Sequence, residues 1–321
     1  MTEIFYEKKD SNYLDNLKIN IKNLYEKYPI NIKKNPKPNK VDLINSFFYK
    51  FYRNSFVPLK IRIKLAQFFR QTSLDVNWLR EFNKYWTMVL KGRPIQTIHD
   101  LFFIKNIYRL KFQYNVLPDT TDPYVHLGAW QRPEIIYQLL DLLCKSDMYH
   151  KCNILKLLKE KKKNFKSFLE FGCAIAPITT TFYEFFKKPK DIKIFISDIQ
   201  TIAFHYACFM YRKCSNVIPI LLTPDNNFLL NIDEKVDAIF CISVFEHLNK
   251  PLDMIKIFKN TLNNKGLLFF DYIKTSGDGL DTKHGMRERE EVLDYINDNF
   301  KLVYGKISKE KSMGLTIIRK L

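Results

Sequence analysis

The chain has 321 residues, about twice the ~150 residues of a typical domain, and this length favours two domains. Apolar residues make up 46% of it and charged residues 27%, a globular balance that excludes a wholly disordered chain. No stretch approaches the ~18 unbroken apolar residues of a membrane-spanning helix, and the first residues lack the basic flank and apolar core of a secretory signal. We therefore expect a cytoplasmic protein with no membrane span.

The net charge of +18 is concentrated in the first half of the chain. Residues 1–166 carry +16 of it and residues 167–321 carry +2. A basic excess of this kind is typical of surfaces that bind nucleic acid, a nucleotide-linked sugar or a lipid headgroup. A compositional bias toward Lys, Asn, Ile, Phe and Tyr also explains it. We favour the bias, because aromatic residues do not interleave with the basic clusters at regular stacking positions.

The cysteines point to a reducing compartment. None of the six forms a CxxC pair, and none lies at zinc-finger spacing to a histidine. They are Cys144, Cys152, Cys173, Cys208, Cys214 and Cys241. We expect reduced thiols and no metal site.

The first half of the chain is predicted to form helices, because aromatic and aliphatic residues recur every three or four positions. The predicted helices span 12–28, 41–53, 58–71, 75–90 and 95–113. The buried face of the fourth consists of Val76, Leu79, Phe82 and Trp86. A further helix is expected after Pro133, with a face of Ile135, Ile136, Leu139, Leu140 and Leu143. We therefore predict a mainly helical N-terminal domain over residues 1–150, which serves as a substrate cap or as a dimerisation surface, so a homodimer stays open.

After residue 166 the pattern changes to short apolar runs that alternate with helical runs. Strands are predicted at about 167–172, 193–198, 217–222, 236–243, 266–273, 301–308 and 315–320. Helices are predicted at 177–188, 200–214, 249–263 and 284–299. Apolar strands that alternate with helices indicate an α/β domain over residues 151–321, with a doubly wound, Rossmann-like parallel sheet. Arg287 and Arg289 open the last helix and are expected on its solvated face.

In a doubly wound sheet, ligands bind beyond the carboxyl ends of the strands, so the residues after each strand form the candidate site. Gly172 follows the first strand and permits a tight turn close to a ligand. Asp198 follows the second strand, 26 positions later, and can accept both hydroxyls of a ribose. Hydrogen bonds to a charged acceptor of this kind are worth about 1.5–3 kcal/mol each. The third strand leads into Asp225 and Asn226, and the fourth leads into Ser243, Glu246 and His247.

Residues of about 165–321 resemble the class I S-adenosylmethionine-dependent methyltransferases. The resemblance rests on Glu170-Phe171-Gly172, on Asp198, on Val236–Ile239 running into Phe245–Leu248, and on Gly266–Phe270. It implies S-adenosylmethionine as cofactor, with the Gly172 loop at the methionine end, Asp198 at the ribose and Asp225 or Asn226 at the adenine. The cofactor-binding candidates are Glu170, Gly172, Cys173, Ala174, Asp198, Ile199, Asp225, Asn226 and Ser243. The resemblance also implies that the last strand, 315–320, runs antiparallel to its neighbours.

The cofactor loop departs from the family pattern. Ala174 and Ala176 stand where the family usually has the second and third glycines of an acidic-x-Gly-x-Gly-x-Gly loop. If either position needs a left-handed backbone, alanine costs about 1–2 kcal/mol there. The departure leaves open a binding protein that keeps the fold without turnover. A nicotinamide enzyme is disfavoured, because the loop lacks the G-x-G-x-x-G spacing that cradles a pyrophosphate.

The resemblance implies in-line methyl transfer from a sulfonium, in which the protein positions the reactants and excludes water. A hydroxyl acceptor needs a general base, and the catalytic candidates are His247, Asp271 and His126. Asp271 can instead brace a neighbouring loop. The acceptor-binding candidates are Tyr124, Trp130, Arg132, Glu246 and His284. Residues 117–134 are expected to fold back over the cofactor, with Arg132 available for a carboxylate or phosphate, unless Trp130 merely packs the domain junction.

We predict an O-methyltransferase for a small molecule or a sugar or glycan precursor, because histidines surround the predicted site. The glycine-rich loop 275–285 is expected to act as a substrate lid. An RNA methyltransferase that grips phosphates with its basic half is the alternative. It is not favoured, because the sequence shows neither an RNA-binding module nor an Asn-Pro-Pro-Tyr-like motif.

Overall fold

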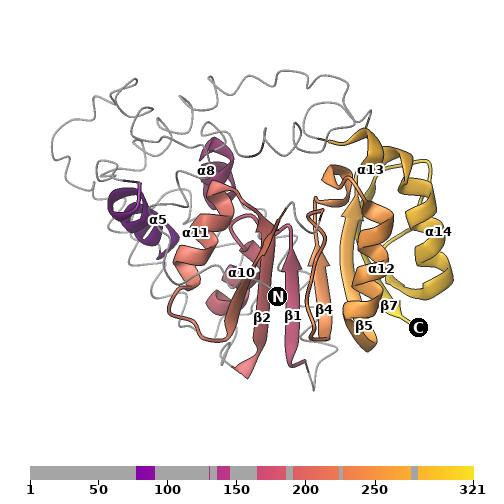
Figure 1. The fold of residues 1–321 in the computed structure, drawn as a ribbon, viewed down its shortest axis with the longest axis horizontal. Coiled ribbons are helices and arrows are strands. Elements are labelled where there is room, and N and C mark those ends of the chain that lie inside the picture. Colours follow the sequence, from indigo (N-terminus) through magenta and orange to yellow (C-terminus); the bar gives the residue numbers. More distant parts are fainter. Residues whose placement is uncertain are drawn as a thin grey trace.

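A computed structural model describes residues 77–90, 130, 136–144, 165–185, 191–223, 227–275 and 281–321 (Figure 1). The helices are α5 (Asn77–Met88), α8 (Ile136–Cys144), α10 (Pro177–Phe185), α11 (Ile202–Tyr211), α12 (Pro251–Thr261), α13 (Lys283–Arg287) and α14 (Arg289–Asn299), with a 3₁₀ turn η4 (Phe245–His247). The strands are β1 (Ser167–Phe171), β2 (Lys193–Ile199), β3 (Val217–Leu222), β4 (Val236–Cys241), β5 (Leu262–Tyr272), β6 (Phe300–Tyr304) and β7 (Met313–Lys320).

The strands form one sheet in the order β3-β2-β1-β4-β5-β7-β6. β1 pairs in parallel with both β2 and β4, whereas β7 pairs antiparallel with β5 and β6. The predicted Rossmann-like sheet and its antiparallel last strand are therefore confirmed. The strand order reverses at β1, so the carboxyl ends of β1 and β4 are where a ligand is expected.

Several predicted elements differ in extent from the observed ones: β6 ends at Tyr304 rather than at 308, and α11 spans Ile202–Tyr211 rather than 200–214. β5 begins at Leu262, directly where α12 ends, rather than at 266. The predicted helix 284–299 is two helices, α13 and α14, which meet at Glu288 (φ −79°, ψ −3°). The Thr282 hydroxyl caps α13 by accepting a hydrogen bond from the Gly285 N–H at 2.7 Å, so a helix begins earlier than the apolar pattern indicates.

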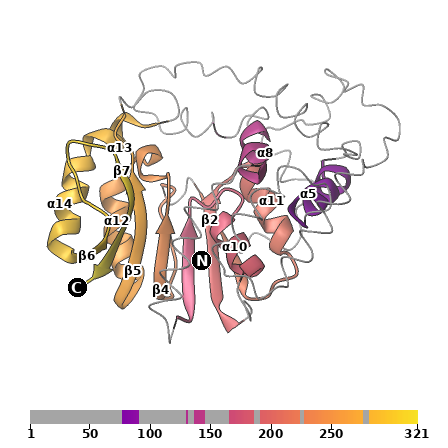
Figure 2. The same cartoon turned by 180° about the vertical axis from the view of Figure 1, so that it is seen from behind.

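Helices cover both faces of the sheet, as Figure 2 shows from behind. Adjacent residues of β1 belong to different buried clusters, because side chains alternate along a strand. Phe168 packs in the cluster that includes Phe182 of α10 and Phe204 of α11. Leu169 packs in the cluster that includes Phe258 of α12 and Leu293 of α14. Burial of each such side chain stabilises the fold by about 1.5–3 kcal/mol, and it fixes the ends of the strands that carry the site.

α5 and α8 both pack against α11. Phe82, Tyr85 and Trp86 of α5 are fully buried, and the Tyr85 hydroxyl lies 2.7 Å from Nδ1 of His205. The prediction of a buried helical face is thus confirmed at Phe82 and Trp86, and on α8 at Ile136, Leu139 and Leu140. The other predicted helices, 12–28, 41–53, 58–71 and 95–113, lie outside the described residues, so the helical N-terminal domain stays a prediction.

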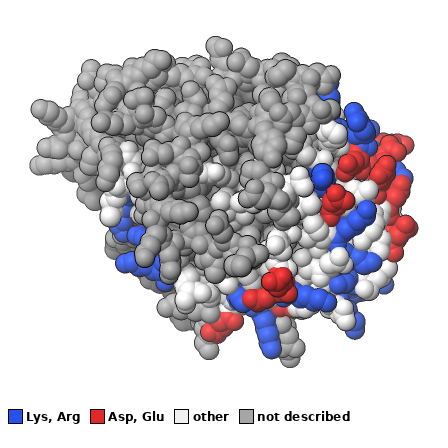
Figure 3. Space-filling view, in the orientation of Figure 1, with Lys and Arg blue, Asp and Glu red and all other residues white. Residues whose placement is uncertain are grey.

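Arg289 is buried, which overturns its prediction as a solvated residue; Arg287 is exposed as expected. The Arg289 guanidinium donates hydrogen bonds of 2.8–2.9 Å to the carbonyls of Ser308, Lys309 and Lys311, and it lies 5.1 Å from the ring centroid of Tyr272. Its fork of donors satisfies the turn between β6 and β7. Around α13 and α14 the surface carries interspersed acidic and basic side chains (Figure 3).

No helix in the described ranges is long and apolar enough to cross a membrane. Cys173, Cys208, Cys214 and Cys241 have free thiols. Burial raises the pKa of Cys173, Cys208 and Cys241, so these thiols stay protonated and unreactive at neutral pH.

Candidate functional site

Glu170 holds the loop after β1 against the start of α10. Its carboxylate is 3% exposed and accepts hydrogen bonds from the backbone N–H groups of Ile178 (2.9 Å) and Thr179 (2.8 Å). The Thr179 hydroxyl donates a third, at 2.8 Å. A carboxylate at a helix N-terminus is stabilised both by these donors and by the helix dipole. Glu170 therefore positions the loop, with both carboxylate oxygens occupied inside the protein.

The loop itself has a left-handed backbone at three positions. Gly172 has φ +61°, and Ala174 and Ala176 have φ of 47° and 52°. The departure from the family pattern thus falls on positions that do need this conformation, at a cost of about 1–2 kcal/mol for each alanine. Ser243, at the end of β4, is also left-handed, with φ 56°. Strain gathered at one edge of a sheet is typical of a functional site.

Replacing Ala174 by glycine is expected to stabilise the protein by about 0.5–1 kcal/mol. The change removes left-handed strain of about 1–2 kcal/mol and adds about 0.5–1 kcal/mol of backbone entropy to the unfolded chain. Urea unfolding measures the difference. Ala203→Gly in the first turn of α11 is the matched control, because its helical backbone carries no left-handed strain and glycine should lose up to about 1 kcal/mol there. Equal losses in both variants would show that the loop is unstrained.

Asp198 joins the end of β2 to this loop. Its Oδ2 accepts a hydrogen bond from the Ala174 N–H at 2.6 Å, and its Oδ1 accepts one from the Ile199 N–H at 2.7 Å. The Cys173 N–H donates to the carbonyl of Ser197 at 3.0 Å. Burial raises the pKa of Asp198 to about 6, although both N–H groups oppose the shift. The carboxylate is thus ionised in most molecules at neutral pH, and two of its roughly four lone-pair directions remain for a ligand.

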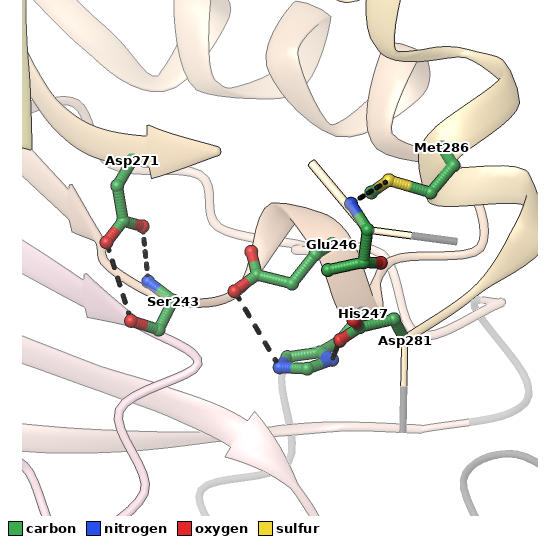
Figure 4. Close-up of polar contacts among 7 residues, drawn as sticks. Ser243, Glu246, His247, Asp271, Asp281 and Met286 are labelled. Atoms are coloured by element: carbon green, nitrogen blue, oxygen red, sulfur yellow. Dashed lines mark hydrogen bonds and ion pairs between the residues drawn. The ribbon is translucent and has the colours of Figure 1, made fainter. Parts of the chain in front are cut away.

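Asp271, at the end of β5, braces the loop after β4. Its Oδ1 accepts a hydrogen bond from the Ser243 N–H at 2.5 Å, and its Oδ2 lies 3.4 Å from the Ser243 hydroxyl (Figure 4). This is the bracing contact that the sequence left open as an alternative to a catalytic role. The contact holds Ser243 in its left-handed conformation.

Glu246, His247 and Asp281 lie together beside this loop (Figure 4). His247 Nδ1 is 3.0 Å from Oδ1 of Asp281, and its Nε2 is 3.9 Å from Oε1 of Glu246. The edge of the Trp130 ring system meets His247, with ring centroids 5.1 Å apart. Burial raises the pKa of Glu246 to about 7, and the charges of Asp271 and Asp281 add to the shift. A histidine oriented by a carboxylate is the arrangement of a general base.

Asp281 was not singled out as a site residue. It belongs to the glycine-rich loop 275–285, whose end is hydrogen-bonded to η4: the Thr282 N–H donates to the Glu246 carbonyl at 2.9 Å and the Thr282 hydroxyl donates to the Leu248 carbonyl at 2.7 Å. Residues 276–280 of this loop lie outside the described part of the chain, so the lid at 275–285 stays a prediction. The spacing of Asp281 from His247 gave no signal of their contact.

The other predicted site residues fall into two groups. His284 lies on α13, which packs against η4. The remaining candidates lie outside the described residues: Tyr124, His126, Arg132, Asp225 and Asn226. The structure therefore brings together Trp130, Glu246 and His247 on one side, and Gly172, Ala174 and Asp198 on the other.

No protein-family model matches the chain, and no curated protein is significantly similar to it. Among solved structures, the N-methyltransferase NodS from Bradyrhizobium japonicum WM9 with S-adenosyl-L-homocysteine is 16% identical, with a TM-score of 0.39 over 54% of this chain and 87% of that one. A S-adenosylmethionine-dependent methyltransferase from Clostridium acetobutylicum ATCC 824 is 14% identical, with a TM-score of 0.41 over 53% and 90%. The [4+2]-cyclase SpnF is 17% identical, with a TM-score of 0.36 over 48% and 59%. These likenesses cover about half of this chain or slightly less, and what they share with it is the fold, a seven-stranded Rossmann-like sheet.

Proposed function

We propose that the protein is an S-adenosylmethionine-dependent O-methyltransferase for a small molecule or a sugar or glycan precursor. The observation that carries the proposal is the 2.6 Å hydrogen bond between the Ala174 N–H and Oδ2 of Asp198. This bond joins the glycine loop and the candidate ribose acceptor at the carboxyl edge of the sheet. In a doubly wound sheet that edge is where a nucleoside binds.

The residues at this edge of the sheet fit the cofactor. A Cβ on Gly172 would lie 2.4 Å from Cγ2 of Val244, so the missing side chain keeps the loop close to the start of η4. Asp198 is partly exposed and has lone pairs left for two ribose hydroxyls. Bound S-adenosylmethionine supplies a methyl group on a positively charged sulfur. Asp198 would hold its ribose, and Gly172 and Ala174 would face its methionine end.

The protein's part in the reaction is to hold the acceptor and to remove its proton. His247 is the candidate base: Asp281 bonds Nδ1, so the lone pair of a neutral ring is at Nε2. Nε2 would take the proton of the acceptor hydroxyl and so make its oxygen the nucleophile. Trp130 lies against the same ring and would exclude water from it.

Titration calorimetry of the full chain with S-adenosylmethionine and S-adenosylhomocysteine tests the proposal. Saturable heat is expected with both. Absence of heat at near-millimolar ligand, from protein shown to be folded by circular dichroism, would refute it.

Asp198→Asn is expected to weaken S-adenosylhomocysteine binding about 10–100-fold. Two charge-assisted hydrogen bonds to the ribose become neutral ones, a loss of about 1–3 kcal/mol in total. Because the pKa of Asp198 is about 6, wild-type affinity should be constant above neutral pH and should fall as the pH drops below 6. Calorimetry across this range measures both effects. The exposed Asp298→Asn is the matched control, and an unchanged affinity in Asp198→Asn would remove Asp198 from the site.

A binding protein without turnover is the second candidate. The left-handed Ala174 and Ala176 favour it, because strain in the loop lowers the free energy that the loop gains when it binds a cofactor. S-adenosylhomocysteine that copurifies with the protein, together with methylation of any acceptor, would exclude it. Binding of RNA by the basic half stays a prediction. Its test is the salt dependence of RNA affinity, which should fall steeply with ionic strength.

A further inference from the structure

Three carboxyl groups and one histidine lie near one another beyond β4 and β5. The charges of Asp271 and Asp281 both act on Glu246, and His247 lies between Glu246 and Asp281. Even with both His247 and Glu246 protonated, Asp271 and Asp281 leave this group with a net negative charge. A region of this sign attracts cations and repels carboxylates and phosphates.

Glu246 is the member of the group whose hydrogen bonding is incomplete. Its side chain is 2% exposed, and its Oε2 has no hydrogen-bond partner among the described residues. The other carboxylate oxygen, Oε1, lies 3.9 Å from His247 Nε2, which is too far for a hydrogen bond. Buried polar groups are nearly always paired, and an unpaired buried carboxylate is costly. An oxygen left in this state at a ligand site indicates a partner on the ligand.

The surroundings of this oxygen favour a cationic nitrogen over a neutral donor. Figure 4 shows the Glu246 carboxylate between the Ser243–Asp271 pair and the His247 ring. Trp130 meets His247 from the side and supplies an aromatic wall. An acidic group beside an aromatic ring suits a protonated amine, which gains from both.

We propose that Glu246 binds a protonated amine or another cationic nitrogen carried by the methyl acceptor. The inference rests on the proposed function, since it assigns the substrate class of the same site. The acceptor is then an amino-bearing small molecule, with its nitrogen at Glu246 and its hydroxyl at His247. Acceptors that carry a carboxylate or phosphate at this point are excluded by the charge of Asp271 and Asp281.

Matched trios of ligands test the proposal on the full chain saturated with S-adenosylhomocysteine. One trio is tyramine, tyrosol and 4-hydroxyphenylacetate, and another is 6-amino-6-deoxyglucose, glucose and glucuronate. Within a trio the group at one position of the molecule is cationic, neutral or anionic, and the rest of the hydroxyl-bearing scaffold is kept. At about pH 8 the cationic member is expected to bind about tenfold more tightly than the neutral one, as one charge-assisted hydrogen bond provides, and the anionic member least.

Glu246→Gln should abolish this preference and leave the affinity for S-adenosylhomocysteine within about twofold, since an amide cannot pair with a cation as a carboxylate does. The exposed Glu291→Gln is the matched control and should keep the preference. A preference that survives in Glu246→Gln overturns the proposal, as does its absence in wild type. An equal loss of S-adenosylhomocysteine binding overturns it too, because Glu246 would then serve the ammonium of the cofactor.

A second measurement needs no variant. In wild type the preference should fade between about pH 8 and pH 6, as Glu246 takes up a proton in the field of His247, Asp271 and Asp281. The charges of Asp271 and Asp281 leave a weaker attraction at the lower pH, but an undiminished tenfold preference for the cationic over the neutral member at about pH 6 contradicts the assignment. Should S-adenosylhomocysteine fail to bind, the proposed function fails, and the same trios on ligand-free protein still decide whether Glu246 selects a cation.

Discussion

Gly172→Ala is expected to destabilise the protein by about 2–4 kcal/mol and to abolish measurable S-adenosylhomocysteine binding. A Cβ at this position would lie 2.4 Å from Cγ2 and 2.9 Å from Cγ1 of Val244, a buried side chain. Moving Val244 aside costs about 1–3 kcal/mol in a packed core, and the left-handed backbone of residue 172 adds about 1–2 kcal/mol. Urea unfolding measures the stability, and calorimetry measures the binding.

Two further variants separate the causes. Val244→Ala in the Gly172→Ala background removes the clashing methyl groups, so it should recover the steric part of the loss and leave the strain. Gly314→Ala in β7 is the matched control, because its added Cβ would meet nothing within 4 Å. If Gly172→Ala is as stable as Gly314→Ala, residue 172 does not approach Val244 closely, and Gly172 has to be removed from the proposed cofactor site.

Local patterns account for most of the fold. Strands such as Lys193–Ile199 were predictable because an apolar run between breakers depends only on neighbouring residues. Arg289 was not predictable in this way. Alternating charges indicate a solvated helix, but the carbonyls that Arg289 satisfies lie about twenty residues further on, in the turn before β7.

The candidate site was also predictable only in part. Gly172, Asp198 and His247 follow strands, so the topology alone predicts that they share one edge of the sheet. The partners that tune them come from elsewhere: Thr179 hydrogen-bonds to Glu170, and Asp281 to His247. Spacing carries no information on such contacts, because loops between elements vary in path. The sequence predicts a strain cost for the two alanines only if their positions need a left-handed backbone. The φ angles of Ala174 and Ala176 show that both positions do.

His247→Ala is expected to lower kcat for methyl transfer by about 10²–10⁴-fold, the usual contribution of a positioned general base. The affinity for S-adenosylhomocysteine should stay within about twofold, because Gly172 and Asp198 hold the cofactor on the other side of the site. At saturating cofactor and acceptor, the part of the rising limb of the pH–rate profile that reports deprotonation of the base should vanish, which leaves the part set by the ionisation of Asp198 and Glu246. Initial rates with labelled S-adenosylmethionine and an amino-bearing acceptor across the pH range measure these effects.

Asp281→Asn should lower kcat less than His247→Ala does, because its amide keeps a contact with Nδ1 at 3.0 Å while losing the charge that stabilises the protonated ring. The double variant should be no worse than His247→Ala alone, since Asp281 acts on the reaction only through the imidazole. A purely structural histidine gives the opposite pattern. Both single variants would then lower the melting temperature, kcat would follow the folded fraction, and the pH profile would keep its shape, which would leave the reaction without His247 as its base.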